Sequence, residues 1–385
     1  MMRRRIGVAL AASVLAAAGA VACGASAGAS TGAARGAMAY VVSYGSGTVT
    51  PILLATNTPG HPIRVGKRPV AIAVTPDGKT AYVVNSGSGT VTPIRTATGV
   101  PSQAIRVGRQ PWAIAMTPDG KTVYVVNRGS GTVTPIRTAT NRPGRPIRVG
   151  KVPDAIAITP DGKTVLVANH GSGSVTPIGT ATGIAASPIL LGAGTWPIAV
   201  AVTPDGKRAY VVDQGAWSVT PVDLVTRTAG RRIQVGDYPY AIAISPDGKD
   251  VYAGSTNANT VTAISTATDT ARHNIRVGDN PTAIAFGPDG NTAYVVNWVS
   301  QTVTPIRVAT GKAGRPIRAG HGPWMIAMSP DGKTAYVADF GFPRNAPGTP
   351  GNTVTPIRIA TDTPERPVKV GAYPIAIAMI PAHPR

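Results

Sequence analysis

The triplet Pro-Asp-Gly returns through the chain at an almost constant interval, and this repeat constrains the fold more than any other feature. The copies lie 42 residues apart, except for one step of 44, and begin at Pro76, Pro118, Pro160, Pro204, Pro246, Pro288 and Pro330. A period of about 40 to 45 residues is typical of the four-stranded blades of a propeller. The repeat therefore predicts a ring of similar sheets.

Each repeat holds four short runs rich in Val, Ile, Thr and Tyr, separated by Gly, Pro, Asn or Asp. This is the pattern of four strands, here named A to D in chain order. In one repeat they start at Pro69, Ala81, Thr90 and Ala104. Eight B strands are predicted, starting at Ala39, Ala81, Val123, Val165, Ala209, Val251, Ala293 and Ala335.

The repeats begin with a B strand at Ala39 and end with an A strand at Pro374. We therefore predict an all-β, eight-bladed β-propeller of four-stranded blades. In this fold the C-terminal A strand joins the N-terminal B, C and D strands and closes the ring. Seven blades plus a stray unit is the alternative, and it would leave an apolar face in solvent.

Asp77 lies in the repeated stretch Thr75-Pro76-Asp77-Gly78, whose residue order is that of a type I turn followed by a residue with positive φ. We interpret Asp77 as a turn residue, because seven such carboxylates spread around a ring cannot pair for acid-base chemistry. Prolines inside the C strands are less easily placed, since each removes a ladder hydrogen bond. A bulge or an outward-facing register would accommodate Pro51, Pro93, Pro135, Pro177, Pro221, Pro305 and Pro356.

The chain carries a formal charge of +20, yet only 14% of its residues are charged. Its basic residues are spread evenly along the sequence and form no run of five or more, and aromatic residues are not interleaved with them. Because nucleic-acid sites gather these residues together, the sequence does not favour a nucleic-acid partner.

The first 22 residues have the order of an export signal, with three arginines followed by an uncharged, apolar stretch. Cys23, the one cysteine, follows small residues as at a bacterial lipoprotein cleavage site, so lipidation there is predicted. Simple secretion and an uncleaved membrane anchor remain as alternatives. Residues 23–38 are predicted to be a flexible tether and residues 39–385 the propeller. The expected location is the cell envelope, with membrane attachment through the lipid.

The repeats, above all AYVVN followed by GSGTVT and IRVG, resemble the YVTN-type β-propeller repeat known from bacterial and archaeal surface proteins. The resemblance covers residues 39–381. It implies the propeller fold and a surface location, whereas its motif says little about activity. Many members carry an acid after the last Ile of the C strand. Here only Asp223 does, while arginines stand there at Arg95, Arg137, Arg307 and Arg358.

Function is expected where the copies differ, which is in the D-to-A and B-to-C connections. Both open on one side of the ring, here named the upper face. All five Trp residues fall in these loops, and we predict a binding surface for an envelope polymer or a surface protein. The predicted ligand-binding residues, gathered around the long insertion at 341–351, are Trp298, Trp324, Phe340, Phe342, Tyr44 and Tyr373, with Trp112, Tyr240 and Arg128 beside them. Capping of the blade ends is the alternative role for these aromatics.

Two other functions remain open. Asp154 and His170 are weak candidates for the acid-base pair of a lactonase-like hydrolase or lyase in the central channel. The other function is a structural surface-coat module, which would associate with itself. We expect a monomeric propeller and favour a binding role over an enzymatic one. The sequence contains no zinc, calcium or phosphate-loop motif, so no metal or cofactor is predicted.

Overall fold

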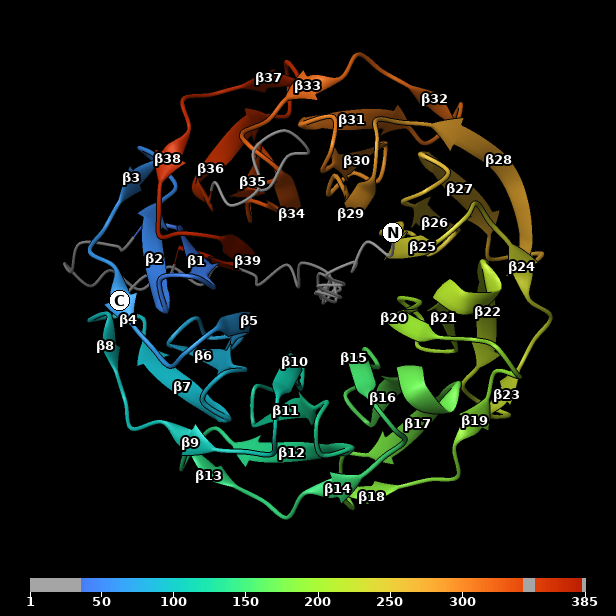
Figure 1. Ribbon diagram of the computed structural model, residues 1–385, viewed down its shortest axis with the longest axis horizontal. Coiled ribbons are helices and arrows are strands. Elements are labelled where there is room, and N and C mark those ends of the chain that lie inside the picture. The colour runs from blue at the N-terminus through green and yellow to red at the C-terminus, as the bar shows by residue number, and fades with distance from the viewer. Residues whose placement is uncertain (1–35, 342–349, 383–385) are drawn as a thin grey trace, which may run out of the picture.

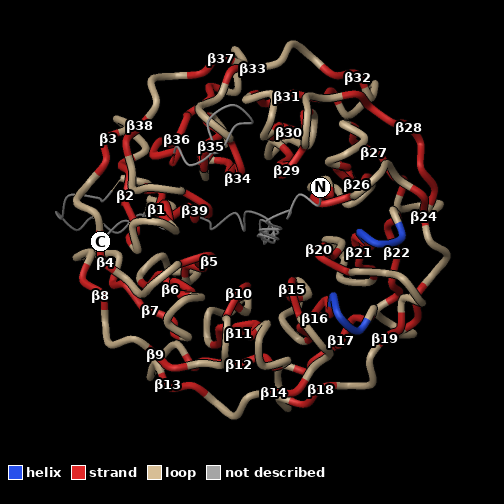
Figure 2. Tube along the Cα trace, in the orientation of Figure 1, coloured by secondary structure: helices blue, strands red, loops and turns tan. Residues whose placement is uncertain are grey.

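The computed structural model describes residues 36–341 and 350–382, and it forms a closed ring of eight antiparallel sheets (Figure 1). Apart from the short 3-10 turns η1 (His170–Ser172) and η2 (Gln214–Ala216), the described residues form strands and loops (Figure 2). The predicted fold class and blade number are confirmed. The signal segment, Cys23, most of the tether and Phe342 lie outside the described residues.

Each blade runs from the channel outward in the order A, B, C, D. The A strands of blades 1 to 8 are β39 (Pro374–Ile380), β5 (Pro69–Val74), β10 (Pro111–Met116), β15 (Pro153–Ile158), β20 (Pro197–Val202), β25 (Pro239–Ile244), β29 (Pro281–Phe286) and β34 (Pro323–Met328). The B strands are β1 (Met38–Ser43), β6 (Thr80–Asn85), β11 (Thr122–Asn127), β16 (Thr164–Asn169), β21 (Arg208–Asp213), β26 (Asp250–Ser255), β30 (Thr292–Asn297) and β35 (Thr334–Gly341).

The C strands are β2 (Thr48–Leu53), β7 (Thr90–Arg95), β12 (Thr132–Arg137), β17 (Ser174–Gly179), β22 (Ser218–Asp223), β27 (Thr260–Ser265), β31 (Thr302–Arg307) and β36 (Pro350–Arg358). Seven D strands are split in two. These are β3 (Thr58–Pro59) and β4 (Ile63–Arg64), β8 (Val100–Pro101) and β9 (Ile105–Arg106), β13 (Arg142–Pro143) and β14 (Ile147–Arg148), β18 (Ile184–Ala185) and β19 (Ile189–Leu190), β23 (Thr228–Ala229) and β24 (Ile233–Gln234), β32 (Lys312–Ala313) and β33 (Ile317–Arg318), β37 (Thr363–Pro364) and β38 (Val368–Lys369). Blade 6 alone among the described blades has one continuous outer strand, β28 (Thr270–Arg276).

The C-strand prolines account for the split outer strands. Both polar backbone groups of a strand residue point to the same neighbour, and Pro51 accepts from Gly60 N at 2.7 Å on the outer side. The missing N–H therefore faces the gap between β3 and β4, so the outward-facing register is the correct alternative. Blade 6 has Ala263 in place of proline, and Ala263 is paired with His273 of the unbroken β28.

Ring closure follows the predicted scheme, with β39 paired antiparallel to β1 from Met38↔Ile380 to Ser43↔Pro374. Adjacent blades then pack large side chains against small ones. Ile114 of blade 3 lies in one buried cluster with Ala71 and Ala73 of blade 2. A tyrosine of the B strand also reaches the next blade, as when Tyr82 Oη donates to Asn141 Oδ1 at 2.7 Å.

The Asp77 turn is structural, as predicted. Asp77 Oδ1 accepts from Lys79 N at 3.0 Å and from Thr75 Oγ1 at 2.6 Å. Gly78 adopts the left-handed φ of 63° that the turn requires. Through Oδ1 the carboxylate holds the A-to-B hairpin.

In blades 2, 3 and 4 the asparagine that ends the B strand ties three strands together at the upper face. Asn85 accepts from Gly66 N at 3.0 Å and donates to Thr92 Oγ1 at 2.9 Å. A Cβ on Gly66 would lie 2.6 Å from this amide, which explains why Gly ends the IRVG motif. In blade 8 the equivalent residue, which lies within β35, is Asp339, and burial raises the pKa of its carboxyl to about 7 despite donors from Thr353 and Thr355.

Asp339→Asn should stabilise the protein at pH 8 by about 1 to 3 kcal/mol, because a buried charge is removed and the amide can bond as Asn85 does. The native carboxyl keeps a proton that the unfolded chain releases near the ordinary aspartate pKa of 3.8. Its stabilising contribution is therefore present at low pH and lost as the pH rises through about 7. Urea titrations at pH 5 and 8 measure the effect, with Asn85→Asp as the reciprocal control. If the free energy of unfolding of Asp339→Asn depended on pH as strongly as that of the wild type, this account would be contradicted.

The residue before the A-strand proline adopts a left-handed conformation in most blades. Asn280 has φ 60° there and Val152 has φ 49°. Asparagine tolerates this region, whereas a β-branched side chain is strained in it. The two positions are equivalent, so blade 4 carries strain that blade 7 avoids.

Val152→Asn should raise the free energy of unfolding by about 1 kcal/mol because it relieves this strain. The reciprocal change, Asn280→Val, should lower it by a similar amount. Urea unfolding monitored by circular dichroism compares the pair. Destabilisation by Val152→Asn would show that valine packing outweighs backbone strain.

Candidate functional site

The two variable loop classes meet on the upper face, as the sequence predicted. In seven blades the residue after the B strand, and in blade 8 Phe340 within β35, donates its N–H to the backbone just before the A strand of the same blade. Arg128 N reaches Gln110 O at 3.0 Å and His170 N reaches Val152 O at 3.0 Å. These bonds place the B-to-C and D-to-A connections side by side.

A β-bulge controls the side chain that follows the A-strand proline. The A–B register shifts between Pro153 and Ala155, so Asp154 has no partner on β16. The equivalent shift places Trp112, Tyr240 and Trp324 in bulges. Because a bulged residue is released from strand alternation, these side chains are free to meet the neighbouring loops. The sequence indicated variation at this position but not the bulge.

The aromatic residues predicted over blades 7, 8 and 1 pack against one another. Trp324 lies 6.1 Å from Trp298, 5.8 Å from Phe340 and 5.8 Å from Tyr240 of blade 6, measured between ring centroids, and Phe340 lies 5.2 Å from Tyr373. We name these five residues the aromatic cap. Trp324 and Phe340 are only 8% and 7% exposed. Most of this aromatic surface is therefore used inside the protein.

Tyr44 and Trp112 pack against the same buried cluster as the aromatic cap. The Nε1 of Trp298 donates to Gly341 O at 3.0 Å, which fixes its ring. The predicted aromatic set is thus brought together, apart from Phe342, which the structure does not describe. The aromatic side chains that remain open to solvent lie elsewhere on the upper face, at Trp196, Trp217 and Tyr238, which are 49%, 50% and 42% exposed.

Opposite this cap, blades 3 and 4 form a charged corner. Arg128 Nε lies 2.6 Å from Asp154 Oδ1, and the guanidinium carbon lies 5.5 Å from the centre of the Trp112 ring. Asp154 is 3% exposed. Burial raises the pKa of this carboxyl to about 6, and the Arg128 charge opposes the rise.

No hydrogen bond or ion pair joins Asp154 to His170, the two acid-base candidates, among the described residues. Arg128 takes the carboxylate, whereas the His170 ring lies 6.0 Å from the Trp196 ring at an interplanar angle of 28°. Burial, assisted by the Arg128 charge, lowers the pKa of His170. The Arg128 charge therefore lowers the pKa of both candidate residues, but Arg128 contacts only Asp154 by an ion pair.

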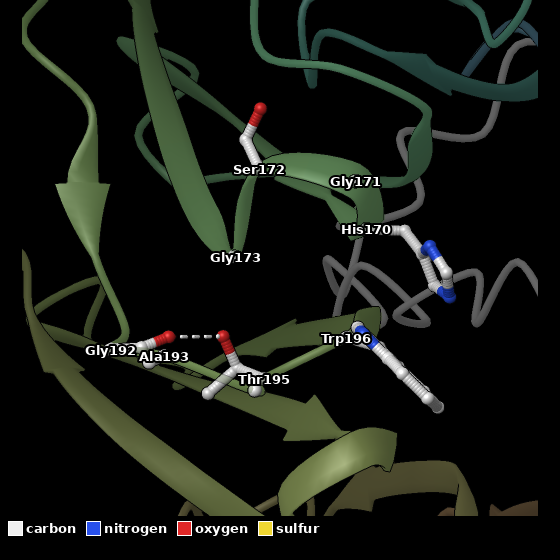
Figure 3. Close-up of a pocket in the computed structure, with 9 residues that line it drawn as sticks. His170, Gly171, Ser172, Gly173, Gly192, Ala193, Thr195 and Trp196 are labelled. Atoms are coloured by element: carbon white, nitrogen blue, oxygen red, sulfur yellow. Dashed lines mark hydrogen bonds between the residues drawn. The ribbon is translucent and has the colours of Figure 1, made fainter.

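A pocket of about 310 Å³ opens between blades 4 and 5 at this histidine. Figure 3 shows His170 and Trp196 on either side of one end of the pocket, with Ser172, Gly173 and Thr195 along it. Thr195 Oγ1 donates to Gly192 O at 2.9 Å and holds the D-to-A connection in shape. A Cβ on Gly173 would lie 2.7 Å from Thr195 Oγ1, so glycine keeps the two loops close.

The sequence contained a signal for this pocket that the prediction did not use. The one 44-residue step between Pro-Asp-Gly triplets spans Pro160 to Pro204. Its two additional residues lie in the connection from Leu191 to Trp196, which forms one wall of the pocket.

Among the described residues, no group of three His, Cys, Asp or Glu side chains could hold a metal ion. No helix in residues 36–341 or 350–382 is long and apolar enough to cross a bilayer.

Comparison with known proteins places the chain among β-propellers. The family model described as "Lactonase, 7-bladed beta-propeller" matches residues 72–183, which cover parts of blades 2 to 4. Among curated proteins, none gives a significant match.

Three of the solved structures that match illustrate the similarity in fold. A hydrazine synthase structure from Kuenenia stuttgartiensis is 26% identical, with a TM-score of 0.60, over 76% of this chain and 96% of that one. The dihydro-heme d1 dehydrogenase NirN, in complex with DHE, is 14% identical, with a TM-score of 0.73, over 89% and 74%. A functionally unknown protein from Desulfotomaculum acetoxidans is 19% identical, with a TM-score of 0.59, over 72% and 94%. The matches support a β-propeller with a lactonase-like segment.

Proposed function

We propose that the protein is an exported binding propeller that takes an envelope glycan on its upper face, anchored in the pocket between blades 4 and 5. The single observation that carries the proposal is Trp196, a half-exposed indole beside His170 at the end of a pocket. The export-signal pattern and the resemblance to YVTN-type surface proteins support the location.

The chemistry of the pocket suits a sugar ring. An exposed indole offers a flat apolar face for the C–H side of a pyranose, and polar groups around it set orientation. His170 is neutral at pH 7 because its pKa is lowered, so its two ring nitrogens supply one donor and one acceptor. Glycines in the lining allow a ligand to approach the backbone closely.

Trp196→Ala should weaken glycan binding by at least tenfold, since loss of a stacking anchor costs about 1.4 kcal/mol or more. Calorimetric titration of residues 36–385 with soluble peptidoglycan glycan chains measures this. Trp298→Ala is the matched control, because Trp298 belongs to the packed aromatic cap. Loss of binding in Trp298→Ala alone would move the site to blades 7, 8 and 1. Absence of binding together with self-association in wild type would favour a surface-coat module.

A second candidate function is lactonase-like hydrolysis at the charged corner. The lactonase family model covers Arg128, Asp154 and His170. Asp154, ionised above about pH 6, can take a proton from water that attacks the lactone carbonyl. Arg128 would stabilise the oxyanion, and the proton then passes to the ring oxygen as its bond to carbon breaks. The product is the open hydroxy acid.

If the corner is catalytic, hydrolysis of a simple δ-lactone should increase through about pH 6 as Asp154 ionises, because the base must be unprotonated. Asp154→Asn should reduce the rate by at least a hundredfold. Proton release in a pH-stat follows the reaction, and circular dichroism checks the fold. A rate that Asp154→Asn leaves unchanged would remove the catalytic hypothesis while leaving the glycan site untouched.

A further inference from the structure

The basic residues are unevenly distributed once they are assigned to blades, contrary to the expectation from the sequence. Residues 67–150, which build most of blades 2 and 3, contain twelve Lys and Arg against two Asp, a net +10. On the outer wall of blade 3 stand Arg137, Arg142, Arg145 and Arg148, all exposed. We name these four residues the arginine wall.

The arginine wall is electrostatically unbalanced. Arg137 and Arg142 are direct partners across β12 and β13, and like charges in that position repel. No acidic residue occurs between positions 137 and 148, and no ion pair joins the four arginines to an acid in the described structure. Blade 8 differs, because there Arg358 pairs with Glu365 at 2.8 Å.

Next to this wall, blade 4 has an outer surface of the opposite character. Residues 174–192 contain no charged side chain, and Ile184 and Leu190 are 67% and 72% exposed. At the position of Leu190 blades 1, 2, 3, 6 and 7 have Arg, and blade 8 has Lys. β14 contacts β18, so the two surfaces adjoin at the rim (Figure 1).

We propose that the joined walls of blades 3 and 4 form a docking surface for an anionic lipid bilayer. The arginines would meet anionic headgroups, while Ile184 and Leu190 enter the interfacial region. A flat membrane meets only a short arc of a convex ring, and these neighbouring walls offer charge and apolar surface within such an arc. A soluble polyanion would use the arginines and leave the exposed aliphatic side chains without a role.

The repeats provide matched variants. Arg145→Gln/Arg148→Gln reduces the arginine wall, and Arg315→Gln/Arg318→Gln makes the same change in blade 7, whose wall has equal charge but no large exposed aliphatic neighbour. Ile184→Thr/Leu190→Gln gives blade 4 the residues that blade 5 carries as Thr228 and Gln234. Neither change in blades 3 and 4 touches the pocket.

The experiment is co-sedimentation of residues 36–385, which hold both ends of the closed ring, with vesicles of phosphatidylglycerol and phosphatidylcholine or of phosphatidylcholine alone. We expect binding to the anionic vesicles only, about tenfold weaker for each double variant of blades 3 and 4 and within twofold of wild type for the blade 7 control.

Three results would overturn the proposal. One is equal weakening by the blade 7 control, which indicates diffuse charge attraction. Another is unchanged vesicle binding by Ile184→Thr/Leu190→Gln together with tight binding to heparin, which indicates a soluble polyanion. The last is no binding to anionic vesicles. Circular dichroism of each variant excludes unfolding as the cause.

Discussion

The pairing of β39 with β1 is the contact on which the rest of the structure depends. It joins Met38 to Ile380, and without it blade 1 would lack its channel-lining strand. Every other blade packs on two neighbours, so an open ring would expose one apolar face at each end. The two partners are separated by almost the whole chain, so their pairing carries a loop-closure entropy cost, and the packing of the closed ring offsets it. A second contact crosses the same boundary, since Tyr336 of blade 8 donates to Asn57 of blade 1 at 2.7 Å.

Repetition made the scaffold predictable. Strand order, blade number, ring closure and the role of Asp77 follow from the spacing of residues whose effects are local. For the C-strand prolines the sequence left two alternatives, a bulge or an outward-facing register. It could not decide between them, because the choice depends on the conformation of the outer strand opposite Pro51. Comparison with Ala263 resolves it in the structure, where the one blade without the proline keeps a continuous strand.

The candidate site was less predictable, because it depends on contacts between blades. The sequence indicated which connections vary and that they open on the upper face. It did not indicate which aromatic rings bury one another. Trp324 and Trp196 each adjoin an A-strand proline, yet one is 8% and the other 49% exposed. The partner of Asp154 was also hidden, since Arg128 comes from the preceding blade. Charge was misjudged because only the spacing of the basic residues was considered, whereas residues 67–150 hold twelve Lys and Arg but only two acids.

The continuous outer strand of blade 6 has a consequence for how molecules can meet. β28 is one continuous outer strand with a bulge at Arg272, whereas the other described outer strands are interrupted opposite a proline. Seven prolines and one bulge thus leave none of the described outer strands as a flat, regular edge, which disfavours pairing of the blades with the sheet of another molecule.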